Sequence, residues 1–121
     1  MKLVLLCATQ RGLAVLKKLT ELLPTCELAV VSFREESCEP PFFEAVREFS
    51  LAHNGSFFEA RRIESEDMAE LWQGTSIDLI LAVSWRYLIP VTIYKRARLG
   101  TYVFHDSLLP AYRGSVQPFG P

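Results

Sequence analysis

Short apolar runs alternate with segments of helical period along this chain. The clearest runs, Lys2–Ala8 and Asp78–Val83, are almost continuously hydrophobic, which is typical of strands buried on both faces of a parallel sheet. Three shorter runs are also predicted to be strands: Leu28–Ser32, Ser56–Glu59 and the residues that follow Gly100. Of these, Ser56–Glu59 is predicted to be a short edge strand.

Between the predicted strands, apolar residues recur with the spacing of amphipathic helices. The predicted helices are Leu13–Leu23, Phe42–His53, Ser65–Gln73 and Pro90–Tyr94. Pro24 ends the first helix, and Leu51 is expected to line the second one together with its phenylalanines. Ser65 is placed to cap the third helix, which carries acidic residues in its first turn and is expected to bury Met68 and Leu71.

This alternation of strands and helices predicts an α/β fold, a Rossmann-like open parallel sheet with helices on both faces. The 121 residues suffice for one domain, 1–121, and the expected strand order is 3-2-1-4 with the fifth strand beyond. The connection Thr9–Gly12 has one glycine and neither a dinucleotide fingerprint nor a phosphate-binding loop, so it is either an anion site at a helix start or a plain turn.

Composition and charge exclude several classes of protein. Half of the residues are hydrophobic and 22% are charged, which suits a globular core. The formal net charge of −1 offers no basic excess for nucleic acid, and no apolar run reaches the roughly 18 residues of a membrane span. Three cysteines without CxxC spacing indicate neither a disulfide framework nor a metal site, and they favour a reducing, cytoplasmic location.

Two loops carry the candidate chemistry, because ligands bind at the carboxyl ends of strands in open parallel sheets. His105 follows the fifth strand and is either a proton-transfer group held by a rigid strand or a structural hydrogen-bonding residue. After the fourth strand, Trp85, Arg86 and Leu88 either form a pocket for a flat heterocycle, or Trp85 caps the core while Arg86 is solvated. We expect a ligand cleft between the loops 84–90 and 105–114.

The segment His105–Pro110, followed by Tyr112-Arg113-Gly114, resembles the signature loop of the folate-dependent formyltransferases. That family includes methionyl-tRNA, glycinamide ribonucleotide and sugar-nucleotide N-formyltransferases. The resemblance extends back through 78–90 to the first strand, so it covers most of the chain. It implies the formyltransferase fold and the transfer of a formyl group from the co-substrate 10-formyltetrahydrofolate to an acceptor amine.

The resemblance also implies roles for particular residues. His105 matches the catalytic histidine of the family. The residues that match folate-binding positions are Arg86, Tyr87, Leu88, Ser107, Leu108, Leu109 and Pro110. No metal is implied.

Two departures from the family pattern reduce the expected activity. The family places an asparagine two residues before the histidine, where this sequence has Val103, which cannot donate a side-chain hydrogen bond. The family's catalytic aspartate falls beyond Pro121, and Asp106 cannot replace it because neighbouring strand residues point to opposite faces. The sequence therefore resembles the N-terminal part of a formyltransferase, and we expect weak folate binding and little transfer.

The acceptor remains open between the amine of an amino-sugar nucleotide, an aminoacyl-tRNA and a smaller amine. The lack of basic excess favours the sugar nucleotide over tRNA, which is not excluded. A non-catalytic folate- or nucleotide-binding module is the alternative function. A hydrolase using Ser107 with His105 is a third reading, although no G-x-S-x-G elbow is present.

Overall fold

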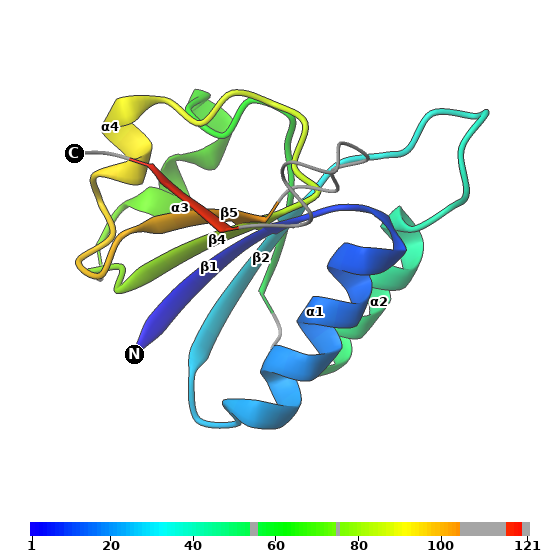
Figure 1. Ribbon diagram of the computed structural model, residues 1–121, viewed down its shortest axis with the longest axis horizontal. Helices are drawn as coiled ribbons and strands as arrows, with labels where there is room; N and C mark the ends of the chain where they lie inside the picture. The colour runs from blue at the N-terminus through cyan, green and yellow to red at the C-terminus, as the bar shows by residue number, and fades with distance from the viewer. Residues whose placement is uncertain (54–55, 75, 105–115, 120–121) are drawn as a thin grey trace.

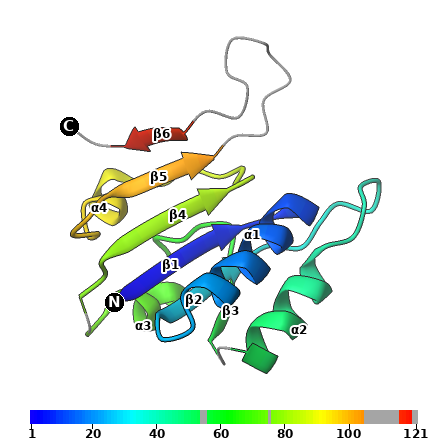
Figure 2. The same cartoon turned by 60° about the horizontal axis from the view of Figure 1, so that its bottom comes forward.

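The computed structural model describes residues 1–53, 56–74 and 76–104, and the backbone of residues 116–119. Its strands are β1 (Lys2–Cys7), β2 (Glu27–Ser32), β3 (Phe57–Glu59), β4 (Leu79–Val83), β5 (Thr101–Phe104) and β6 (Val116–Phe119). They form one sheet in the order β3-β2-β1-β4-β5-β6 (Figure 2). The pairings from β3 to β5 are parallel, which confirms the predicted fold class and strand order, whereas β6 pairs antiparallel with β5.

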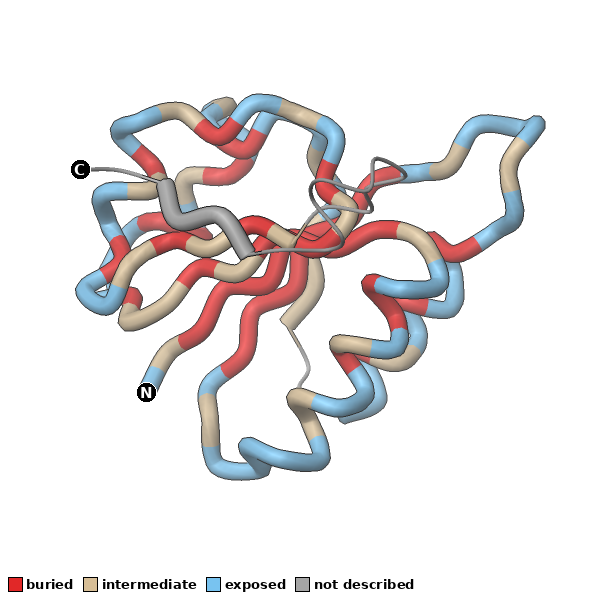
Figure 3. The backbone as a smooth tube through the Cα atoms, viewed as in Figure 1, coloured by how far each residue is buried: buried red, intermediate tan, exposed pale blue. Residues whose placement is uncertain are grey.

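The sheet is centred on β1, which pairs with β2 on one side and with β4 on the other. Its residues Leu3–Cys7 are all buried, because layers cover both faces of the strand (Figure 3). Val4 and Leu6 contribute to one hydrophobic cluster, and Leu3, Leu5 and Cys7 contribute to the other. A continuous apolar run is what a strand needs when both of its faces are buried.

Helices cover the two faces of the sheet, as predicted. On one face lie α1 (Thr9–Leu22) and α2 (Phe43–His53). On the other lie a short 3-10 turn (Glu66–Met68), α3 (Ala69–Trp72) and α4 (Val91–Tyr94) (Figure 1). The Trp72 indole Nε1 donates a buried hydrogen bond of 2.6 Å to the Ile63 carbonyl, which fixes α3 to the segment before it.

The structure of the helices corrects the sequence prediction at three places. The segment Thr9–Gly12 is the first turn of α1 and not a connecting loop. The predicted helix from Ser65 is split, because the Met68 N–H donates to the Ser65 carbonyl in an i to i+3 turn and the Ser65 hydroxyl forms no cap. In α2, Leu51 is 47% exposed and does not line the buried side. Met68 and Leu71 are buried as expected.

Candidate functional site

The loops expected to carry the site leave neighbouring strands at the same edge of the sheet. β4 and β5 are adjacent and parallel, with Val83 opposite Phe104 at their carboxyl ends. The β4 loop, residues 84–90, therefore starts next to the carboxyl end of β5. His105, Ser107, Leu108, Leu109 and Pro110 lie outside the described residues, so their roles stay predictions.

Two non-glycine residues at this edge adopt the left-handed backbone conformation. Thr9 follows β1 with φ 66°, and Ser84 follows β4 with φ 57°. The two turns are side by side, because the Ala8 N–H donates to the Val83 carbonyl at 3.1 Å. The second turn is also tied to β5, since the Ser84 N–H donates to the Phe104 carbonyl at 3.2 Å. Such conformations cost roughly 1–3 kcal/mol each and cluster at functional sites.

An aromatic cluster forms the floor of the β4 loop. The Phe33 ring packs edge-to-face against Trp85 at 5.2 Å, Tyr87 at 4.9 Å and Phe42 at 5.7 Å between ring centroids. Trp85 is only 8% exposed and belongs to the hydrophobic core. Of the two readings that the sequence left open for Trp85, the structure supports the one in which it caps the core.

Arg86 is partly exposed, but it is not free. Its Nη1 donates to Glu39 Oε1 at 2.8 Å and its Nη2 donates to Glu39 Oε2, so the guanidinium and carboxylate form a two-point pair. The guanidinium carbon also lies 5.2 Å from the Phe33 ring centroid and 6.0 Å from that of Phe42. The hydrogen bonds from Arg86 are the main cause that lowers the pKa of Glu39 to about 2, and the same bonds raise the pKa of Arg86.

The sequence did not predict Glu39 as part of this site. Glu39 lies on the β2–α2 loop (residues 33–42), 47 positions before Arg86, and no motif links the two residues. The other two predicted residues of the β4 loop differ in environment. Tyr87 packs on Phe33, whereas Leu88 is 79% exposed and presents an apolar side chain to solvent.

Three buried polar atoms at this edge lack a hydrogen-bond partner among the described residues. They are Thr9 Oγ1, Ser32 Oγ and Trp85 Nε1, at the carboxyl ends of β1, β2 and β4. Buried polar groups in proteins are almost always paired with protein, water or ligand. Their gathering at one edge is therefore consistent with a polar occupant at the ends of these strands.

Val103, at the position where the family pattern has asparagine, is 3% exposed within β5. A buried valine has no side-chain hydrogen-bond donor, so a donor for an oxyanion would have to come from another residue or from the backbone.

Among the described residues, no group of three histidine, cysteine or acidic side chains is arranged to hold a metal ion. In the same part of the chain, no helix is long and apolar enough to cross a membrane.

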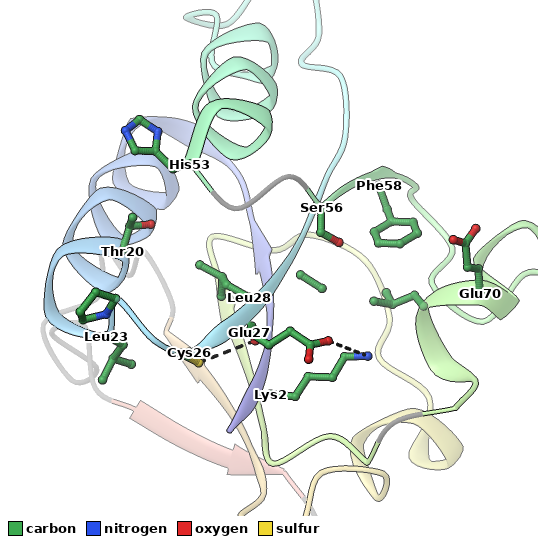
Figure 4. Close-up of a pocket in the computed structure, with 13 residues that line it drawn as sticks. Lys2, Thr20, Leu23, Cys26, Glu27, Leu28, His53, Ser56, Phe58 and Glu70 are labelled. Carbon is green, nitrogen blue, oxygen red and sulfur yellow. Dashed lines mark hydrogen bonds and ion pairs between the residues drawn. The ribbon is translucent and has the colours of Figure 1, made fainter.

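Two cavities are not lined by residues of the β4 loop itself. One of about 500 Å³ opens at the carboxyl edge and shares the wall formed by Phe33; its other lining residues are Arg34, Glu59, Ala60, Arg61, Arg62, Ser65 and Asp67. The second, of about 330 Å³, lies at the opposite, amino edge of the sheet (Figure 4). There the mostly buried Lys2 Nζ is 3.7 Å from the exposed Glu27 carboxylate. Because parallel sheets bind ligands at the carboxyl edge, we do not assign the amino-edge cavity to the site.

Comparison with known proteins places the chain in a family. A profile described as formyl transferase matches residues 16–119, which is most of the chain. The chain therefore belongs to the formyl transferase family, as its signature loop indicated. This membership agrees with the parallel α/β sheet described above.

Curated relatives with significant similarity include several methionyl-tRNA formyltransferases. That of Azobacteroides pseudotrichonymphae is 31% identical over 76 residues, which are 63% of this chain and 23% of the relative. Those of Chlorobium chlorochromatii and Bacteroides fragilis are 34% and 29% identical over 71 and 74 residues, 59% and 61% of this chain and 22% of each relative. The matched segment thus spans less than a quarter of the length of these relatives.

Proposed function

We propose that this chain provides the folate-binding part of an N-formyltransferase, which passes a formyl group from 10-formyltetrahydrofolate to an acceptor amine. One observation carries the proposal: in a member of the formyl transferase family, the β4 loop and the segment after β5 leave adjacent parallel strands at the ligand-binding edge. The unpaired polar atoms at the same edge add support. In this proposal Arg86–Leu88 and Ser107–Pro110 surround the folate.

The proposed chemistry is acyl transfer. The acceptor nitrogen attacks the formyl carbon, a new C–N bond forms, and the bond from the formyl carbon to the folate nitrogen breaks. His105 is proposed to take the proton released by the attacking amine and to return it to the leaving folate nitrogen. An imidazole with a pKa near 6.5 suits this task near neutral pH.

A second candidate function is a folate- or nucleotide-binding module without transfer activity. The specific observation that favours it is the burial of Val103, which leaves no side-chain donor at the position of the family asparagine. Oxyanion donors contribute about 2.7–4 kcal/mol to acyl transfer, so their loss would slow the reaction without preventing folate binding.

Two acceptors are proposed for testing. The relatives are named for methionyl-tRNA, which makes a methionyl-tRNA the first acceptor to test. The net charge of −1 favours the amine of an amino-sugar nucleotide, which carries fewer phosphates. The cavity beside Phe33 is lined by three arginines and two acidic residues, and Arg34 and Arg62 are already paired with Glu59 and Glu64, so it would provide only modest counter-charge for carboxylates of folate or phosphates of either acceptor.

The test measures binding and transfer separately on the 121-residue chain. Calorimetric titration with tetrahydrofolate should give weak but saturable binding, and transfer from 10-formyltetrahydrofolate to methionyl-tRNA and to an amino-sugar nucleotide should be slow. Binding without any transfer would support the module. No folate binding at millimolar concentration would refute both functions.

A further inference from the structure

The Arg86 side chain is tied to the protein through its two terminal nitrogens. An arginine has five N–H donors in a rigid fork, and both of its terminal nitrogens here donate to one carboxylate. Aromatic rings of Phe33 and Phe42 lie beside the same guanidinium. With side-chain exposures of 38% for Arg86 and 20% for Glu39, the pair is partly shielded from water.

Glu39 is itself held in place. Its Oε1 accepts a hydrogen bond of 2.7 Å from the Glu36 N–H, and the Glu39 N–H donates to the Glu36 carbonyl at 3.2 Å. The carboxylate is therefore presented by a closed turn rather than by a freely moving side chain. Such pre-organisation reduces the entropy lost when the ion pair forms.

The β2–α2 loop that carries this turn is anchored to the core at two further points. Glu35 Oε1 accepts hydrogen bonds from the Phe42 N–H at 2.6 Å and the Phe43 N–H at 2.8 Å, at the start of α2. The Gln10 side chain donates to the Pro41 carbonyl at 2.8 Å and ties the loop to α1. Although the loop extends beyond the sheet edge (Figure 1), these hydrogen bonds hold both it and Glu39 in place.

We infer that Glu39 is a positioning residue for the proposed folate site. By holding the Arg86 guanidinium against Phe33 and Phe42, it fixes the backbone of the β4 loop, and Arg86 serves the site as an anchor and not as a side-chain contact of the ligand. An anionic ligand that required the same two-point contact with the terminal nitrogens would have to displace the Glu39 carboxylate. The backbone of residues 86–88 is left to meet a flat heterocycle. The identity of the ligand in this inference rests on the proposed function, whereas the role of Glu39 in fixing the β4 loop does not.

Ordinary surface ion pairs contribute little to stability, typically 0–1 kcal/mol. The test must therefore distinguish an ion pair that orders the β4 loop from one that has no effect on it. The 121-residue chain is suited to ¹⁵N relaxation by NMR. We compare Glu39→Gln with Glu36→Gln, a matched control on the same loop. The Glu36 carboxylate makes no ion pair with a described residue and acts on Arg86 only at longer range.

Without ligand, Glu39→Gln is expected to lower the order parameters of the amides of residues 86–88 from about 0.85 toward 0.6, the flexible range, while Glu36→Gln leaves them unchanged. The exchanged pair, Glu39→Arg with Arg86→Glu, should restore part of the order. Equal order parameters in the two single variants would overturn the anchor. If Glu39→Gln does not fold, Glu39→Asp provides a milder change with the same measurement.

With tetrahydrofolate, Glu39→Gln should weaken binding about three- to tenfold, while Glu36→Gln should match the parent chain. Tighter binding to Glu39→Gln would overturn the inference, because it would mean that Glu39 competes with the ligand for Arg86. If the parent chain binds no folate but the β4 loop loosens as expected, the anchor stands and the proposed function fails. The two failures are thereby distinguished.

Discussion

Gly12 of α1 lies directly against Cys7 of β1. A side-chain carbon placed on Gly12 would be 3.0 Å from Cys7 Cβ and 3.2 Å from the Cys7 carbonyl carbon. The helix therefore approaches the central strand more closely than any other residue at position 12 would allow. The glycine is required here for space and not for a left-handed backbone, because a side chain would meet Cys7.

We predict that Gly12→Ala destabilises the protein. Alanine is favoured over glycine in helices by about 1 kcal/mol, but overpacking against backbone costs about 1–3 kcal/mol. Because the contacted atoms belong to a buried strand, the packing cost should win, with a net loss of up to about 2 kcal/mol in urea unfolding. Ala14→Gly, at an exposed position of the same helix, measures the helix preference alone. A Gly12→Ala variant more stable than the parent would contradict the packing effect.

Acid should weaken the link between the β2–α2 loop and the β4 loop. Because hydrogen bonds from Arg86 lower the pKa of Glu39 from 4.5 to about 2, this group favours the folded state above pH 4.5. Its contribution is lost as the pH falls from 4.5 to about 2. Unfolding measured across this range should show a smaller loss for Glu39→Gln than for the parent chain. Parallel profiles for the two proteins would show that the pair adds no pH-dependent stability.

The thiols should differ strongly in reactivity. Burial raises the pKa of Cys7 to about 12, so almost none of it is the reactive thiolate at neutral pH. Cys38 is exposed on the β2–α2 loop. Iodoacetamide labelling followed by mass spectrometry should modify Cys38 in the folded protein and Cys7 only on unfolding in urea. Modification of both at equal rates under native conditions would mean that β1 is not buried as described.

His105→Asn tests the proposed proton transfer. The change keeps size and some hydrogen bonding but removes titration, so transfer should fall about 100- to 10,000-fold in a form of the enzyme that shows measurable turnover. Tetrahydrofolate binding should stay within about twofold, because the folate contacts are proposed elsewhere. Unchanged turnover with normal folate binding would assign His105 a structural role.

The strands were predictable because a parallel sheet leaves a strong local signal. Lys2–Cys7 and Leu79–Val83 lie in the interior of the sheet and read as apolar runs, and the alternation of strands with helices predicts a parallel sheet. The β6 strand gave no such signal, since Pro118 within a four-residue run argues against a strand except at an edge.

The missed features depend on contacts between distant residues. Nothing local distinguishes Glu39 from the other acidic residues of its loop, and its pairing with Arg86 exists only once β2 and β4 share an edge. Gly12 reads as a loop residue because glycine disfavours helices, whereas close packing on Cys7 decides its place. The core position of Trp85 likewise follows from Phe33, which is 52 positions earlier by the numbering of the two residues.

The internal pairing of the β2–α2 loop changes how its charge is read. The sequence Arg34-Glu35-Glu36 with Glu39 suggests an acidic surface that would repel phosphates. In the fold, Glu35 caps α2 and Glu39 neutralises Arg86, so within residues 33–42 the carboxylate of Glu36 is the one left to solvent. A polyanionic acceptor approaching this edge would therefore meet fewer unpaired carboxylates than the sequence of the loop suggests.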